Sequence, residues 1–282
     1  RRLRDGPVAD RVNASSGAHR VRLSHRQSET SGAGSERIET LPTGISVLDR
    51  EFGGGLPSGS VVVLKADPAS QSELIVDRFS RPRECRYLTT VRSADAVEAS
   101  LTLGGTGESA DAEKADAEST DGERVDAETA DAERVDVGSD ADEGGGDGKT
   151  VVEETTPDAP LDDVLAAAAE LPEHGTLVVD SIEPLEAADR SGYGSFLTDL
   201  RRHVADAGGL AVVHAFKRDT GRNRLLTEQV ADVVFDLRTT VTGTEIANRL
   251  IVPKFRGGAA LEEPLKLKLT DTVSVDTSRD IA

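Results

Sequence analysis

The sequence lacks most of the residues that would indicate a secreted, metal-binding or membrane protein. Its 282 residues include one cysteine, Cys85, and no methionine or tryptophan, which excludes a disulfide framework and a multi-cysteine zinc site. No run of 18 apolar residues occurs, so we expect no membrane span. Basic residues are few, with 33 Lys and Arg against 52 Asp and Glu. Because affinity for phosphate needs clustered cations, we do not expect nucleic acid as a partner. These absences together favour a soluble cytoplasmic protein.

The negative charge is concentrated in one segment, residues 104–149. Between Gly104 and Gly148 there are 16 acidic residues, 3 basic residues and no aromatic residue. An Asp-x-Glu unit recurs there every five residues, a step that builds up neither a helix face nor a strand face. Low hydrophobicity with high charge therefore predicts a disordered acidic insertion. We favour a solvating spacer over an acidic docking segment.

A second segment outside the core covers residues 1–37. It contains eight Arg, four acidic residues and little apolar clustering, which predicts a disordered Arg/Ser-rich arm. Residues 38–103 and 150–282 are then the first and second parts of one core. Its roughly 200 residues suffice for one well-packed domain.

Within the core, apolar runs alternate with segments of helical periodicity. Runs such as residues 60–64 and 176–180 are typical of strands buried on both faces, whereas residues 265–269 alternate strictly, as in antiparallel strands. The fold class predicted is α/β, a mostly parallel sheet flanked by helices with antiparallel C-terminal strands. We expect strands at residues 60–64, 86–91, 150–153, 176–180, 210–215, 233–237, 265–269 and 272–275.

Several strings in this core resemble the RecA-like ATPases of the KaiC and RadA type. Thr43-Gly-Ile-Ser-Val-Leu-Asp49 and Gly53-Gly-Gly-Leu-Pro-Ser-Gly-Ser60 come directly before a predicted strand, and further similar strings lie at residues 231–237 and 251–258. They occur in the family's order and extend over the whole core. The resemblance implies a RecA-like fold, ATP and Mg²⁺ as the cofactors of active members, and assembly with like subunits.

The position of the phosphate-binding loop departs from that family. A P-loop, G-x-x-x-x-G-K-[ST], binds phosphates through glycine N–H groups and a lysine, and Mg²⁺ through a hydroxyl. The corresponding residues here are Ala66, Asp67, Pro68, Ala69, Ser70, Gln71, Ser72 and Glu73. Ala66 and Gln71 replace the glycines, Ser72 the lysine and Glu73 the hydroxyl residue. Asp67 and Glu73 also add negative charge where phosphates would lie, and like charges about 4 Å apart repel by about 1 kcal/mol even in water.

The resemblance also locates two acidic positions. The acidic pair that activates water in the family falls at Val91-Arg92, and neither side chain can act as a general base. Asp180, at the end of a predicted strand, matches the Walker-B aspartate. A cap or turn former is an equally good interpretation of Asp180.

The string Lys254-Phe-Arg256 matches a K-x-R pair that, in related hexamers, reaches the neighbouring subunit's γ-phosphate. A basic pair on a solvent-facing strand edge is the favoured alternative. Two further residues receive structural interpretations. His214 is expected to be a satisfied core or strand-end histidine. Cys85 is expected to be structural, although Arg83 and Arg86 could lower its pKa.

These departures favour a catalytically degenerate RecA/KaiC-like protein, a regulatory or interaction subunit without ATP hydrolysis of its own. We expect no bound cofactor and a protein partner, either a second copy or a RecA/KaiC-like paralogue. The alternative is an ATPase with an unconventional phosphate loop that binds ATP and Mg²⁺, in a mixed ring or in DNA recombination and repair.

The charge composition resembles that of proteins from salt-loving archaea. The chain has 26 Arg but only 7 Lys, and a net charge of −19. Because the Debye length is about 3 Å in 1 M salt, such a surface repels itself far less there than in dilute buffer. We therefore expect a high-salt cytoplasm.

Overall fold

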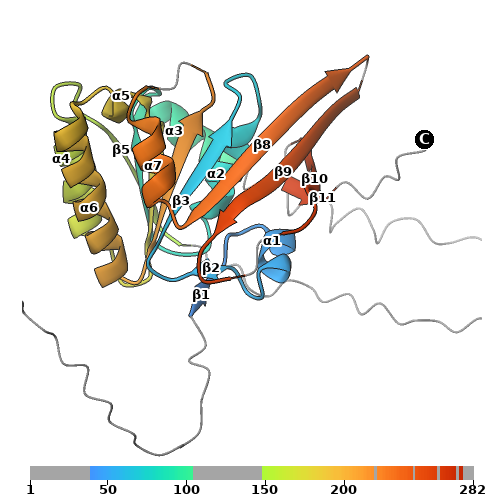
Figure 1. Ribbon diagram of the computed structural model, residues 1–282, viewed down its shortest axis with the longest axis horizontal. Helices are drawn as coiled ribbons and strands as arrows, with labels where there is room; N and C mark the ends of the chain where they lie inside the picture. The colour runs from blue at the N-terminus through green and yellow to red at the C-terminus, as the bar shows by residue number, and fades with distance from the viewer. Residues whose placement is uncertain are drawn as a thin grey trace, which may run out of the picture. The chain divides into compact units, whose positions relative to one another are not determined.

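The centre of the fold is a nine-stranded sheet in the computed structural model (Figure 1). The structure describes residues 39–103, 148–218, 221–243, 245–258, 261–270 and 273–275. The expected arm, residues 1–37, lies outside these ranges, and so does the expected insertion, residues 104–149, apart from its last two residues.

The elements alternate along the chain as the sequence predicts. The strands are β1 (Thr40–Leu41), β2 (Leu56–Pro57), β3 (Ser60–Ala66), β4 (Cys85–Thr89), β5 (Thr150–Glu154), β6 (Thr176–Asp180), β7 (Leu210–Phe216), β8 (Val233–Thr242), β9 (Glu245–Phe255), β10 (Leu265–Leu269) and β11 (Val273–Val275). The helices are α1 (Ser46–Glu51), α2 (Ser72–Phe79), α3 (Ala94–Leu103), α4 (Pro160–Ala169), α5 (Glu183–Glu186), α6 (Arg190–Asp206) and α7 (Arg224–Val230).

The sheet is parallel on one side and antiparallel on the other. Its order is β11-β10-β9-β8-β3-β7-β6-β4-β5. The strands from β8 to β5 pair in parallel, whereas β8, β9, β10 and β11 pair antiparallel. This arrangement confirms the predicted α/β class with antiparallel C-terminal strands. The short strands β1 and β2 form a separate antiparallel pair.

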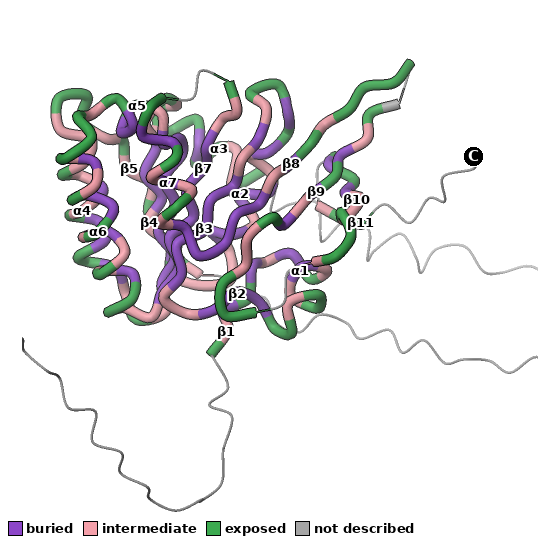
Figure 2. The backbone as a smooth tube through the Cα atoms, in the orientation of Figure 1, coloured by how far each residue is buried: buried purple, intermediate pink, exposed green. Residues whose placement is uncertain are grey.

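Two apolar layers cover the faces of the sheet, because successive strand residues point to opposite sides. On β3, Val62 and Leu64 pack with α1 and α2, whereas Val61 and Val63 pack with α4 and α6. Figure 2 shows that the central strands are buried along most of their length. Burial on both faces explains why these strands have continuous apolar sequences.

Strand β9 is the one strand of the nine-stranded sheet that the sequence analysis missed. It contains Pro253 and has no strict apolar alternation, so it does not match either strand pattern. In the structure it lies between β8 and β10, and Lys254 pairs with Val234 of β8. Because β9 has a neighbouring strand on each side, Lys254 does not lie on an edge strand of the sheet, and Arg256 follows the end of β9. The favoured interpretation of the two residues as a strand-edge pair is therefore wrong for Lys254.

The parallel strands place their carboxyl ends at one edge of the sheet. Ala66, Asp180 and Phe216 end β3, β6 and β7, which are neighbours in the sheet. Ligands of open α/β sheets bind at this edge, where the strand order changes direction. In the ranges that the structure describes, no helix is both long and apolar enough to cross a membrane.

The glycine string before β3 forms the turn from α1 into β2. Gly53 and Gly55 have φ values of +70° and +122°, which side chains rarely adopt. A Cβ atom added to Gly55 would lie 2.1 Å from the carbonyl oxygen of Leu41, in β1, whereas one added to Gly53 would meet no atom within 4 Å. Gly55 is therefore required by backbone strain and by close packing, and Gly53 by strain alone.

We expect Gly53→Ala to lower the free energy of unfolding by about 1 kcal/mol through the left-handed backbone. Gly55→Ala should cost about 1–3 kcal/mol more, because the β1–β2 pair must move to admit the methyl group. Urea unfolding of both variants measures the difference. Equal effects of the two substitutions would show that the close approach of β1 to Gly55 does not contribute.

Candidate functional site

The loop that matches the P-loop position is a short turn between β3 and α2. Ala66 is the last residue of β3 and Ser72 the first of α2. The Ser70 N–H group donates a hydrogen bond to the carbonyl oxygen of Asp67 at 2.9 Å, and the Ser70 hydroxyl donates to the same oxygen at 2.6 Å. Ser70 thus directs both donors back onto the loop. This differs from a P-loop, in which successive N–H groups converge on phosphate.

The structure separates the two acidic residues of this loop. Glu73 lines a cavity of about 220 Å³, and Asp67 lines a different one of about 500 Å³. Asp67 lies 3.8 Å from the exposed guanidinium of Arg218. The expected negative charge is therefore present at this edge of the sheet but divided between two cavities.

Ser72, which takes the place of the P-loop lysine, belongs to a buried hydrogen-bond network. Its Oγ lies 3.0 Å from Nε2 of His214, and Nδ1 of His214 lies 2.7 Å from Oδ1 of Asp180. Ser72, His214 and Asp180 are all less than 10% exposed. The register brings them together, since β7 lies between β3 and β6 and pairs His214 with both Leu64 and Asp180.

The other oxygen of Asp180 accepts two more hydrogen bonds. The Tyr87 hydroxyl donates to Oδ2 at 2.9 Å, and the Arg92 guanidinium donates to it at 2.8 Å. Burial alone would raise the pKa of Asp180, but its interactions with His214 and Arg92 outweigh burial and lower the pKa to about 2. Burial and the adjacent Asp180 raise the pKa of Tyr87 well above its usual value. Asp180 is therefore an ionised acceptor and Tyr87 a permanent donor.

The residues present do not fit Mg²⁺ and ATP. Both carboxylate oxygens of Asp180, the Walker-B-like residue, are used by side chains of the same chain. Ser72 is paired with His214, and Glu73 stands at the position of the Mg²⁺-binding hydroxyl. No lysine lies in the loop.

Three residues of this network were not selected as functional by the sequence analysis. His214 is buried and hydrogen-bonded, as expected of a satisfied strand histidine, but its partners are the two site residues Ser72 and Asp180. Arg92 marked only the loss of the family's acidic pair, and Tyr87 had no assigned role. The sequence does not show that β4 pairs with β6 and that Thr89 lies beside Asp180, which is the pairing that brings Tyr87 and Arg92 close to Asp180.

Lys254 and Arg256 contact the end of α7 in the same chain. The Lys254 ammonium donates to the carbonyl oxygens of Glu228 and Gln229 at 2.8 and 3.0 Å, and Arg256 donates to Gln229 at 3.2 Å. Arg256 also lies 3.4 Å from Asp232. Cations at a helix carboxyl end satisfy free carbonyls and the helix dipole. Their proposed role between subunits stays a prediction.

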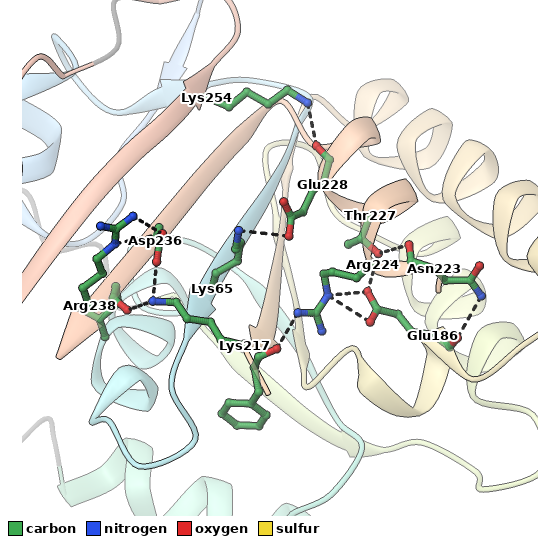
Figure 3. Close-up of polar contacts among 12 residues, drawn as sticks. Lys65, Glu186, Lys217, Asn223, Arg224, Thr227, Glu228, Asp236, Arg238 and Lys254 are labelled. Carbon is green, nitrogen blue, oxygen red and sulfur yellow. Dashed lines mark hydrogen bonds and ion pairs between the residues drawn. The ribbon is translucent and has the colours of Figure 1, made fainter. Parts of the chain in front are cut away.

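A larger polar cavity, of about 500 Å³, lies beside the ends of β3 and β7 and the middle of β8. Its charged side chains form ion pairs, Lys65 with Glu228 at 3.2 Å and Asp236 with both Lys217 and Arg238 (Figure 3). The lining residues are Lys65, Asp67, Lys217, Arg224, Glu228, Asp236, Arg238, Thr239 and Thr240. The sequence analysis did not predict this cavity.

Beside this cavity, a buried cluster of ion pairs joins α7 to α5. Arg224, 4% exposed, donates to Glu186 at 2.8 Å, to Glu183 at 2.7 Å and to the carbonyl oxygen of Phe216 at 2.6 Å. Figure 3 shows the guanidinium of Arg224 between Glu186 and the end of β7. A buried charge is tolerated only with such complete pairing.

The pKa of Cys85 is raised, not lowered as its two arginine neighbours in the sequence would allow. Burial raises the pKa of this thiol, and the opposing effect of Arg83 is smaller. A buried thiol of raised pKa is inert. The structural interpretation of Cys85 therefore agrees with its environment, and activation by neighbouring arginines does not.

We expect Asp180→Asn to lower the free energy of unfolding by about 3–5 kcal/mol at pH 7, the usual cost of breaking a buried charge pair. The amide would point N–H groups at a donor, either His214 or the Tyr87–Arg92 pair. Because the folded pKa of Asp180 is depressed, its contribution is complete above the unfolded pKa near 3.9 and disappears as pH falls through about 2. Urea unfolding at pH 7 measures the loss. The exposed Asp162→Asn is the control, and an equal, small change in both would contradict the prediction.

Comparisons with known proteins place this site in context. The chain matches a family described as a family of unknown function (DUF7125), over residues 40–140 and 128–282. No curated protein matches it. Among solved structures, it is similar to the KaiC-like protein PH0186 from the hyperthermophilic archaeon Pyrococcus horikoshii OT3. The TM-score is 0.57 at 14% identity, over 84% of this chain and 99% of that one. This likeness confirms the RecA-like fold expected from the sequence strings, and the chain belongs to the DUF7125 family.

Proposed function

We propose that this protein is a RecA/KaiC-like subunit that does not hydrolyse ATP and acts through contacts with a protein partner. The observation that carries the proposal is the use of Asp180, whose two carboxylate oxygens accept hydrogen bonds from His214, Tyr87 and Arg92. These three hydrogen bonds occupy three of the roughly four lone-pair sites of the carboxylate, so a Mg²⁺ ion there would compete with them. Each buried donor that it displaced would need a new partner, at a cost of about 1–3 kcal/mol.

The lost lysine supports the same proposal. Ser72 carries no charge, and its hydroxyl is paired with His214 in a buried position. The cation nearest the site is Arg92, which pairs with Asp180 at 2.8 Å. The charge of Asp180 is thus balanced within the chain, Glu73 adds a negative charge beside it, and a triphosphate would bring further negative charge without a matching cation.

We infer a degenerate haloarchaeal paralogue working in a high-salt cytoplasm as the setting of this function. The excess of Arg over Lys and the net charge of −19 support this inference. The partner that fits best is another RecA/KaiC-like chain or a second copy of this one, since the fold is shared with a KaiC-like protein.

Calorimetric titration with Mg-ATP in molar salt tests the loss of nucleotide binding. We expect no binding at millimolar ATP by the natural chain. The variant carrying Gln71→Gly, Ser72→Lys and Glu73→Thr restores three P-loop residues and should gain affinity, with Gln71→Gly alone as the control. Micromolar binding with measurable turnover by the natural chain would favour the alternative, an ATPase with an unconventional loop.

Mass measurement in molar salt tests the partner. We expect this protein to form a mixed assembly when a RecA/KaiC-like ATPase from the same organism is added, because it offers the fold without a competing nucleotide site. Lys254→Ala with Arg256→Ala is the informative variant, and Lys266→Ala is its control on β10. A chain that stays alone with every such ATPase, and does not self-associate, would contradict the proposed interaction role.

A further inference from the structure

Ser72, His214 and Asp180 have the arrangement of a nucleophile, a base and an orienting acid. The Ser72 Oγ to His214 Nε2 distance is 3.0 Å, and the His214 Nδ1 to Asp180 Oδ1 distance is 2.7 Å. These lie within the hydrogen-bond reach expected of such a triad, which is recognised by geometry on unrelated folds. The three residues come from separate elements, α2, β7 and β6.

From this geometry we propose that Ser72 is a nucleophile for acyl transfer, and that the protein hydrolyses small, uncharged carboxylic esters. This activity needs no nucleotide, and it goes beyond the proposed function without resting on it. His214 is the base, and Asp180 is the residue that positions it.

The hydrogen-bond pattern sets the tautomer that a base requires. Asp180 is ionised and can only accept, so Nδ1 of His214 carries the proton of their hydrogen bond. In the neutral ring Nε2 is then an acceptor, and the Ser72 hydroxyl donates to it. Tyr87 and Arg92 hold Oδ2 of Asp180, which leaves Oδ1 directed at His214. The Phe216 ring packs edge-to-face with His214, with 4.6 Å between the ring centroids, and restricts the imidazole further.

The cavity of about 220 Å³ beside this triad defines the substrate class. His214 and Asp180 line it, and so do Ser70 and Glu73, which flank the Gln71-Ser72 pair in the sequence; Ser72 itself, 1% exposed, lies behind this lining. Pro68, Val91 and Phe216 supply apolar walls. The volume is below the roughly 300–1,000 Å³ of pockets for drug-sized ligands, which restricts the site to short acyl groups. Arg92 also lines the cavity, but it is paired with Asp180, so the Glu73 carboxylate at the wall disfavours negatively charged esters.

The start of α2 provides donors for the developing oxyanion. The first N–H groups of a helix have no intrahelical acceptor, and no side chain caps the N-terminus of α2. The N–H group of Leu74 donates to the carbonyl oxygen of Gln71 at 3.2 Å. Ser72 is the first residue of this helix, so the N–H groups of Ser72 and Glu73 lie next to the nucleophilic oxygen. Backbone N–H groups so placed stabilise the tetrahedral intermediate of acyl transfer.

The proposed reaction has two balanced steps. The Ser72 oxygen bonds to the ester carbonyl carbon while its proton passes to Nε2 of His214. The bond from that carbon to the alcohol oxygen then breaks, and the alcohol leaves with the proton. In the second step water attacks the acyl-serine, again with His214 accepting and returning a proton. A carboxylic acid is released, and the Ser72 hydroxyl is regenerated.

A small fluorophosphonate tests the nucleophile in the full chain, in molar salt and without nucleotide. The Ser72 oxygen should displace fluoride and form one phosphonate ester per chain, seen in the intact mass. Fragmentation of the tryptic peptide covering residues 66–78 distinguishes Ser72 from Ser70, the other serine in that peptide. No adduct, or an adduct at Ser70 or elsewhere, would overturn the proposal.

Variants separate the triad from a merely structural network. Ser72→Ala should abolish labelling and the hydrolysis of p-nitrophenyl acetate above the buffer rate. His214→Gln, which keeps hydrogen-bonding groups but is no base, should slow both about 100-fold or more. Ser191→Ala, at an exposed serine of α6, is the matched control and should change neither rate. Folded variants that keep the natural rate would overturn the proposal, and circular dichroism establishes that they are folded.

Discussion

The ionised carboxylate of Asp180 is the interaction on which the rest of the site depends. It lies at the end of β6, 7% exposed, and is bonded to side chains of three other segments, through His214 of β7, Tyr87 of β4 and Arg92 after β4. A charge buried to this extent is stable only if its lone pairs are satisfied. His214 in turn holds Ser72, which fixes the first turn of α2 against the sheet. Three strands and a helix are thereby joined at one carboxylate.

This network shows how the phosphate-loop edge of a RecA-like fold satisfies its polar side chains within the chain. The acidic Walker-B-like position needs a cation, and Arg92 supplies it from within the chain at 2.8 Å. The lysine position is filled by an uncharged serine, and a histidine occupies the space between serine and aspartate. Each of these three residues is stable in its place only when the other two are present. A lysine at position 72 would meet the imidazole, whereas Asp180 without His214 and Arg92 would be a buried charge without partners.

Much of the fold could be predicted from the sequence, because the strands of the parallel half are buried on both faces and have continuous apolar runs. Strand β9 could not, because Pro253 and charged residues interrupt its pattern and because its place depends on pairing with β8 and β10. For the site, the sequence strings located Ser72, Glu73 and Asp180. The contacts that these residues make could not be predicted from the sequence, since Ser72 and His214 are 142 residues apart and Arg92 and Asp180 are 88 apart. Local patterns carry no information on such pairs, and the histidine in particular had the sequence context of any buried strand residue.

The proposed loss of nucleotide binding and the proposed acyl transfer have the same physical origin. In a nucleotide site the carboxyl edge of the sheet must present free donors and a free carboxylate. The charged ligand then satisfies both. Here the same edge satisfies its carboxylate internally, and this orients the imidazole of His214 with one nitrogen toward Asp180 and the other toward Ser72. An internally paired aspartate is a poor metal ligand, but it is what a histidine needs to act as a base on a hydroxyl. The side chains that we propose exclude Mg²⁺ are therefore the ones that align the serine.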